Sequence, residues 1–227
     1  MTNGCAEQAP IQDVLPNHTL ACAAGIQHWV CENAKSARAY LKRIDALVPL
    51  TQPLQQLDIQ ELPHAVHKKG DHRVEFDART LLAPILAGHD LGLLSEAGMP
   101  AIADPGSSLV RAAHDLGVVV VPLVGPISLL LALAASGLNG QNFAFVGYLP
   151  QDASERQARL RQLENTALSS GQSQIFIETP YRNAALWSSL VQTLQPGSRL
   201  AFSSGLTLTS AVNQSSTTQQ WRKLPLG

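Results

Sequence analysis

Short apolar runs alternate with amphipathic segments along most of the chain, and this alternation predicts strands and helices in turn. In the first half the pattern predicts strands at 26–31, 91–95 and 118–123, and helices at 34–44, 76–87 and 107–116. In the second half it predicts strands at 143–147, 174–178, 200–204 and 215–221, and helices at 127–136, 154–168 and 182–194. Residues 48–71 have weak periodicity and are expected to be mostly irregular. This alternation is typical of an α/β protein with a mainly parallel sheet.

The segment Pro122–Pro126 is rich in proline and glycine and divides the pattern into two α/β halves. We therefore expect an N-terminal α/β domain over residues 1–122 and a C-terminal α/β domain over residues 123–227. A chain of 227 residues that is 45% hydrophobic is long and apolar enough for two modest packed cores.

Residues 116–151 contain no charged residue, and a stretch of this length is compatible with a membrane span. However, Pro122, Gly125 and Pro126 interrupt it, and these residue types break helices. The stretch is therefore expected to form a strand, a tight loop and a buried helix, and no membrane association is predicted.

The three cysteines, Cys5, Cys22 and Cys31, are odd in number and lack CxxC spacing, and residues 1–17 do not resemble a signal peptide. These features predict a cytoplasmic protein.

The net charge of −1 excludes a general basic field for nucleic acid, so contact with RNA would need a local patch. One cluster offers such a patch, although a solvated loop is its simpler interpretation; its members are His64, His67, Lys68, Lys69, His72 and Arg73. No metal is expected there.

Four loops rich in glycine and proline each follow a predicted apolar strand. The longest lies in Leu91–Gly106, with Gly98, Pro100, Pro105 and Gly106 between a strand and a helix. The others are Val121–Ser128, Phe145–Pro150 and Phe176–Arg182. Ligands of α/β proteins bind outside the carboxyl ends of the strands, and glycine allows close approach to the backbone. Four such loops in order predict a ligand site.

The motifs S-E-A-G-M-P…A-D-P-G, V-x-G-P-x-S, F-V-G-Y-L-P and E-T-P-Y-R resemble the tetrapyrrole (corrin/porphyrin) methylase superfamily. They are most similar to its branch of ribosomal RNA small-subunit methyltransferases that act on the ribose 2′-oxygen. The resemblance implies the class III methyltransferase fold, in which two α/β domains enclose a cleft for S-adenosylmethionine, and it implies a homodimer.

The resemblance also assigns cofactor contacts, residue by residue, to the four loops. In the N-terminal domain these are Gly98, Met99, Pro100, Ile102 and Ala103. In the C-terminal domain they are Ser128, Leu129, Tyr148, Leu149, Thr179 and Pro180. Glu32 and Glu178, at two strand ends, are the weak candidates for acid/base roles, with structural hydrogen bonding as the alternative for Glu178.

Two departures from the family pattern affect the functional prediction. Nothing in residues 1–17 matches the family's first strand and its Pro-x-Pro-x-Gly loop, so we expect the N-terminal domain to lack that strand and the cofactor site to be weakened. The A-E-D-T-R segment of the RNA-methylating branch is replaced by Val30–Lys35, which keeps Glu32 but has Asn33 and Lys35. The predicted function is S-adenosylmethionine-dependent methylation of ribosomal RNA. A tetrapyrrole or other small-molecule methyltransferase, or a catalytically silent binding relative, is the alternative.

Overall fold

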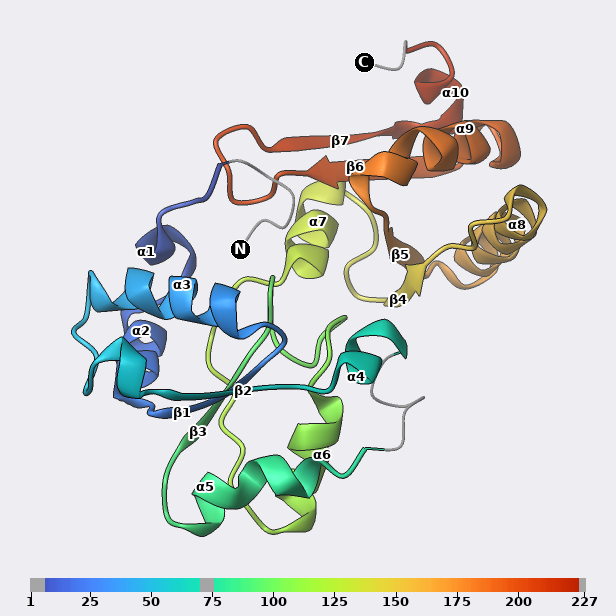
Figure 1. Cartoon of the computed structure of the whole chain (residues 1–227). Helices are drawn as coiled ribbons and strands as arrows, with labels where there is room; N and C mark the ends of the chain where they lie inside the picture. The colour runs from blue at the N-terminus through green and yellow to red at the C-terminus, as the bar shows by residue number, and fades with distance from the viewer. Residues whose placement is uncertain (1–6, 70–75, 225–227) are drawn as a thin grey trace. The chain divides into compact units, whose positions relative to one another are not determined.

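The computed structural model describes residues 7–69 and 76–224, and it divides the chain into two compact units. The first unit contains the described residues up to Ile127, and the second begins at Ser128 (Figure 1). The division falls after the Pro122–Pro126 loop, whereas the sequence pattern placed it at the start of that loop. Both units combine helices with parallel strands, which confirms the predicted α/β class.

The first unit is built on a three-stranded parallel sheet of order β2-β1-β3. The strands are β1 (His28–Cys31), β2 (Asp58–Glu61) and β3 (Leu91–Leu94). In their register, His28 of the central strand lies opposite Asp58 on one side and Leu91 on the other. The carboxyl ends of all three strands therefore lie along one edge of the sheet.

Each face of this sheet packs on its own hydrophobic core. Helices α1 (Ile11–Val14), α2 (Asn17–Gly25) and α3 (Ala34–Asp45) contribute to the first core, which contains Trp29 of β1 (Figure 1). The 3-10 helix η2 (Ala78–Leu82) and α6 (Ser107–Asp115) contribute to the second core, which contains Val30. Successive side chains of a strand point to opposite faces, so two neighbouring residues of β1 anchor the two cores.

Short elements complete the first unit and correct two predictions. The expected helix 76–87 is η2 followed by one turn of α-helix, α5 (Ala83–Leu86). Proline is tolerated only in the first turn of an α-helix, so Pro84 prevents the α-helix from beginning earlier. The segment 48–71, expected to be irregular, contains a 3-10 turn η1 (Leu54–Gln56), β2 and α4 (His64–Lys69). Strand β2 is only four residues long, and it is recognised as a strand by its hydrogen-bonded pairing with β1. The pattern of hydrophobic residues in the sequence cannot reveal such a pairing.

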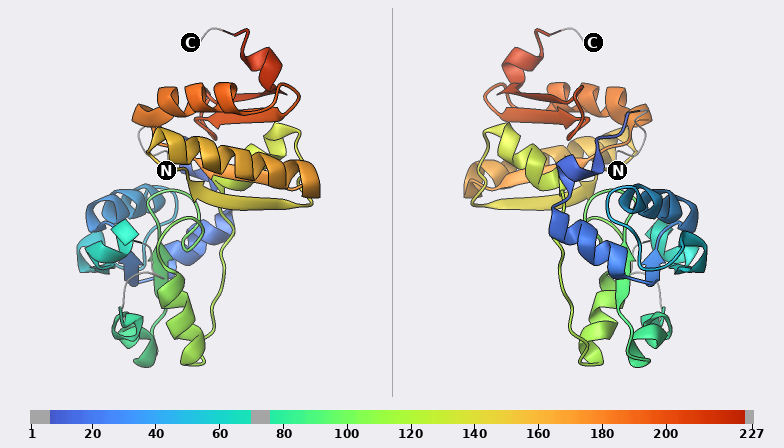
Figure 2. Two further views of the ribbon diagram at one scale, coloured as in Figure 1. Left: turned by 90° about the vertical axis from the view of Figure 1, so that its right-hand side faces the viewer. Right: turned by 90° about the vertical axis from the view of Figure 1, so that its left-hand side faces the viewer.

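The second unit contains a parallel pair of strands and an antiparallel hairpin. The pair is β4 (Phe143–Tyr148) with β5 (Ser173–Ile177), and the hairpin is β6 (Arg199–Ser204) with β7 (Val212–Thr217). Helix α7 (Ser128–Ser136) packs on the hairpin, and α8 (Ala153–Ser170) contacts β5 (Figure 2). The remaining elements are the 3-10 turn η3 (Pro180–Arg182), α9 (Asn183–Thr193) and α10 (Thr218–Trp221).

Local sequence signals explain the ends of several of these elements. The carboxylate of Asp152 accepts hydrogen bonds from the amides of Ser154 and Glu155 and begins α8. Gly171 ends the same helix in the left-handed conformation. The last predicted strand is wrong after Thr217, because the side chains of Thr217 and Gln220 form a capping box that begins α10.

The predicted strand 118–123 is absent from the structure, although its alternating burial is present. Val118 and Val120 pack on the second core, whereas Val119 and Val121 are exposed, Val119 by 84%. Within the described ranges no strand pairs with this segment, so its backbone forms no ladder.

The predicted buried helix 127–136 forms as α7, but Leu130 and Leu131 on it are exposed. None of the described helices is long and apolar enough to cross a membrane.

The extended segment generates a testable prediction. Across residues 7–69 and 76–224, the amides of Val119, Val120 and Val121 have no hydrogen-bond acceptor. We expect these amides to exchange with deuterium at close to the rate of an unfolded chain, while the amides of the central strand β1 are protected. Hydrogen exchange read by NMR or mass spectrometry measures both. Equal protection of the two segments would show that residues 119–121 pair with another strand.

A second prediction concerns Gly92 of β3, which pairs with Trp29 of β1. A Cβ atom at Gly92 would lie 2.5 Å from the ring of Trp29, so the ring occupies the space that a side chain would need. Gly92→Val should therefore lower the free energy of unfolding by about 1–3 kcal/mol, as overpacking of cores does. Urea denaturation measures this change. Gly25→Ala, whose added methyl group would meet no atom within 4 Å, is the matched control and should leave stability nearly unchanged.

Candidate functional site

The loop between β3 and α6, residues 95–106, has an unusual backbone. Four of its residues have positive φ angles: Gly98 (89°), Ala101 (63°), Ala103 (63°) and Gly106 (132°). The left-handed conformation costs an alanine about 1–2 kcal/mol, so the loop holds two strained residues. Hydrogen bonds from the Ala101 amide to the Pro105 carbonyl (3.3 Å) and from the Ile102 amide to the Met99 carbonyl (3.2 Å) hold this shape. Strain of this kind occurs preferentially at functional sites.

The five residues predicted from the first unit all lie on this loop, at the carboxyl end of β3. Gly98, Ile102 and Ala103 are exposed, and Met99 and Pro100 are half-buried. Ile102 exposes 45% of its surface, which is high for an isoleucine. The loop thus presents apolar side chains and backbone to solvent next to a sheet edge, as a ligand-binding loop does.

Carboxylates from two neighbouring strand ends surround the base of the loop. The carboxylate of Glu32, just after β1, accepts a hydrogen bond from the amide of Glu96 (3.1 Å), just after β3. The hydroxyl of Ser36 in α3 donates to the Glu96 carboxylate. Asn33 is the N-cap of α3, and its side-chain oxygen accepts from the amides of Lys35 and Ser36. Glu32 and Ser36 therefore join the loop to the start of α3.

Burial and the nearby carboxylates raise the pKa values of two groups. Burial, the charge of Glu32 and, more weakly, that of Glu96 raise the pKa of Asp104 to about 6, against the opposing effect of a hydrogen bond from Ser95. Burial, with the charges of Glu61 and Glu96, raises the pKa of the Cys31 thiol to about 11. Cys31 is therefore a buried core residue whose thiol stays protonated at neutral pH, which does not favour nucleophilic chemistry.

In the second unit, the predicted residue Thr179 belongs to a hydrogen-bonded group around Glu178. The Glu178 carboxylate, whose side chain is only 7% exposed, forms an ion pair of 2.6 Å with Arg182. It also accepts from the Thr179 amide at 2.8 Å. Arg182 donates to the Thr179 hydroxyl (3.3 Å), and its guanidinium lies 5.7 Å from the ring centre of Tyr148. Arg182 thus links the ends of β4 and β5.

The structure places the other predicted residues of the second unit at the same strand ends or at the start of α7. Tyr148 is 56% exposed at the end of β4, and Leu149 beside it is buried in the core of the unit. Ser128 is the exposed first residue of α7 and Leu129 is buried, whereas Pro180 is exposed in η3. Leu149 and Leu129 therefore support their loops through packing.

Two residues gain importance that the sequence alone did not reveal. The pKa of Asp104 is raised by burial and by the charge of Glu32, which is 72 positions away in the chain. Arg182 was part of a motif without a role of its own, and its contact with Tyr148 depends on the pairing of β4 with β5. The only sequence signal for either was its position in a loop rich in glycine and proline.

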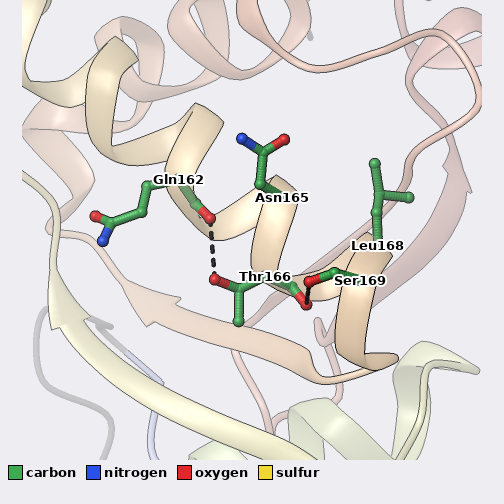
Figure 3. A pocket seen from close by; sticks show the side chains of 5 residues that line it. All are labelled: Gln162, Asn165, Thr166, Leu168 and Ser169. Atoms are coloured by element: carbon green, nitrogen blue, oxygen red, sulfur yellow. Dashed lines mark hydrogen bonds between the residues drawn. The ribbon is translucent and has the colours of Figure 1, made fainter.

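Other kinds of site find little support. In the described part of the chain, no group of three or more histidine, cysteine or acidic residues could hold a metal ion. His67 and His72, from the predicted basic patch, fall outside what the structure describes of side chains. One shallow hollow is lined by Gln162, Asn165, Thr166, Leu168 and Ser169 (Figure 3). All five belong to α8, and none is a predicted site residue.

The raised pKa of Asp104 predicts a specific pH dependence. Because the folded state binds this proton more tightly than the unfolded state, the free energy of unfolding should fall as pH rises from about 4 to about 6. Asp104→Asn removes the titration, so the variant should become more stable relative to the parent over that range. Urea denaturation between pH 4 and 8 measures this. Asp77→Asn is the control of opposite sign, since the Arg79 side chain lowers the pKa of Asp77. A parallel pH profile for the Asp104 variant and the parent would contradict the prediction.

Comparison with known proteins gives consistent results. Ribosomal RNA small subunit methyltransferase I of Vibrio cholerae is 36% identical over 129 residues, which are 57% of this chain and 42% of that protein. The enzyme of the same name from Escherichia coli O157:H7 is 37% identical over 129 residues, 57% of this chain and 43% of that protein. The match thus spans less than half the length of these curated relatives.

Two solved structures share the fold. The methyltransferase CobJ superposes with a TM-score of 0.55 at 20% identity, covering 92% of this chain and 82% of that one. The cobalt precorrin-4 methyltransferase CbiF gives 0.51 at 10% identity, with the same coverage. The family model of tetrapyrrole (corrin/porphyrin) methylases matches residues 26–214, which include all four loops. The chain therefore belongs to the tetrapyrrole (corrin/porphyrin) methylase family.

Proposed function

We propose that this protein is an S-adenosylmethionine-dependent methyltransferase that modifies a ribose 2′-oxygen of small-subunit ribosomal RNA. The observation that carries the proposal is the strained, exposed loop 95–106 at the carboxyl end of β3. It coincides with the predicted cofactor contacts Gly98, Met99, Pro100, Ile102 and Ala103. The contacts predicted in the second unit, including Tyr148 and Thr179, are part of the same proposal.

The residues on and around the loop suit this cofactor. S-adenosylmethionine carries a positive sulfonium and an amino group, and Glu32, Glu96 and Asp104 supply negative charge at the base of the loop. Met99 and Ile102 offer apolar surface for the adenosyl group. When bound, the cofactor supplies an activated methyl group. The loop's contribution is to bind and orient, which supplies most of the acceleration when the nucleophile is correctly placed.

The acid/base candidates differ in their suitability. The Glu178 carboxylate is buried and paired with Arg182, so it suits the structural alternative better than proton transfer. Glu32 lies beside the loop, but its carboxylate accepts the amide of Glu96. We therefore propose that Glu32 orients the loop, and we assign the proton transfer to neither residue.

The choice of ribosomal RNA follows the names of the curated relatives, whereas the similar solved structures support only the fold. A tetrapyrrole acceptor is the alternative within the family. We further propose that the protein works in the cytoplasm, as its cysteine pattern predicts, and that it is a homodimer, as the resemblance implies. Sedimentation at micromolar concentration tests the homodimer.

A binding protein without turnover is the second candidate. It is favoured by Asn33, which replaces an acidic residue of the RNA-methylating branch and whose side-chain oxygen caps α3. Isothermal titration with S-adenosylhomocysteine measures binding, and transfer of a tritiated methyl group to small ribosomal subunits measures turnover. Binding without transfer would support this second candidate, and a folded protein that shows no binding at hundreds of micromolar would exclude both.

A matched pair of glycines tests the loop itself. Gly98→Val should abolish binding of S-adenosylhomocysteine, because a β-branched residue cannot keep φ near 89° and the loop must rearrange. Gly88→Val is the control, since Gly88 has φ 88°, follows α5, and would meet no atom within 4 Å if it carried a Cβ. Both variants should lose similar stability in thermal unfolding. Unchanged affinity in Gly98→Val would show that the loop is only structural.

A further inference from the structure

Helix α3 carries an unusual concentration of positive charge for this protein. It contains Lys35, Arg38, Lys42 and Arg43 and a single acidic residue, Asp45, whereas the whole chain has a net charge of −1. The structure separates these cations into two groups. Arg43 is half-buried and donates to the Gln8 side chain (3.0 Å) and to the Ala9 carbonyl (2.6 Å). The Arg43 guanidinium therefore holds the segment around Gln8 and Ala9 against α3 through hydrogen bonds.

The other three cations, Lys35, Arg38 and Lys42, form what we call the α3 stripe. Their spacing of three and four residues places them along one side of the helix, and all three are exposed. The buried side of α3 contains Ala37, Leu41 and Ile44. Within the ranges that the structure describes, no ion pair engages the stripe. Asp45 lies at the far end of the helix and accepts the amide of Leu50 (3.0 Å).

The stripe begins at the candidate site. Asn33 caps α3 directly after β1, and the hydroxyl of Ser36 donates to Glu96 in the loop 95–106. The helix therefore starts beside the proposed cofactor loop and leads away from it. From Lys35 to Lys42 the axial rise is about 10 Å, so the three cations can reach neighbouring phosphates of one strand.

We propose that the α3 stripe binds the phosphate backbone of the RNA substrate and guides it to the loop 95–106. This inference rests on the proposed function and adds the surface that holds the acceptor. Long cationic side chains contact phosphates without reading sequence, so the stripe fixes the position of the RNA and leaves the choice of nucleotide to other contacts. It is a separate surface from the basic cluster at 64–73 that the sequence suggested, and it has a described link to the loop through the hydrogen bond from Ser36 to Glu96.

The test compares two triple variants with the same change in charge. Lys35→Gln/Arg38→Gln/Lys42→Gln removes the stripe, and Arg111→Gln/Arg161→Gln/Lys223→Gln removes three exposed cations elsewhere. The probe is a fluorescein-labelled single-stranded RNA of mixed sequence, titrated by anisotropy at several salt concentrations. We expect the stripe variant to lose at least about tenfold in affinity and to flatten the slope of log K against log salt by about 2. The control variant should bind nearly as the parent does, and both should melt as the parent does.

Several outcomes would overturn the inference. Equal losses in both triple variants would show a general effect of net charge, and no loss in the stripe variant would place RNA elsewhere. A parent that does not bind the RNA at low salt would overturn it as well. Titration of the stripe variant with S-adenosylhomocysteine separates this inference from the proposed function. If the stripe variant still binds the cofactor product but no longer binds RNA, the result supports both the stripe and the proposed function. If the stripe variant loses RNA binding but neither it nor the parent binds the cofactor product, the result supports the stripe as an RNA-binding surface and contradicts the proposed methyltransferase.

Discussion

The central strand β1 is the constraint on which the first unit depends. Trp29 and Val30 are neighbours in β1 and point to opposite faces of the sheet. Trp29 belongs to one hydrophobic core and Val30 to the other, so both cores are attached to the same strand. The ring of Trp29 fits only because Gly92 in the neighbouring strand has no side chain. The same pairing sets the register of β1 and β3, and the register brings Glu32 and Glu96 together at the carboxyl ends. Packing in the sheet thereby determines the chemistry at its edge.

The loop 95–106 combines rigidity with exposure in a way that an ordinary connection does not. A flexible loop would relax Ala101 and Ala103 to negative φ, whereas here local hydrogen bonds keep both in the left-handed region. Gly106 adds a steric reason, because a Cβ atom there would lie 2.8 Å from Leu93. The loop is thus anchored on β3 at one end and on α6 at the other. The residues between these anchors include Gly98 and Ile102, which are exposed to solvent in a fixed backbone conformation.

The sequence predicted the elements that have strong local signals. The helix 154–168 and α3 were recognisable because of their amphipathic spacing. Elements that depend on distant partners could not be predicted. β2 is a strand only through its pairing with β1, and residues 118–123 have a strand-like pattern but no strand beside them in the described ranges. The same holds for the candidate site. The loops rich in glycine and proline could be predicted from the sequence, whereas the neighbours of Asp104 and Arg182 could be identified only in the folded structure.

The contacts of Arg182 have a consequence for conformational entropy. A tyrosine that is 56% exposed and a threonine on a surface turn would each normally sample several rotamers in solution. Here one guanidinium, held by a buried carboxylate, restricts both side chains before anything binds. A ligand that touches Tyr148 and Thr179 therefore meets side chains that have already lost much of their freedom, and less of its binding energy is offset by ordering the protein.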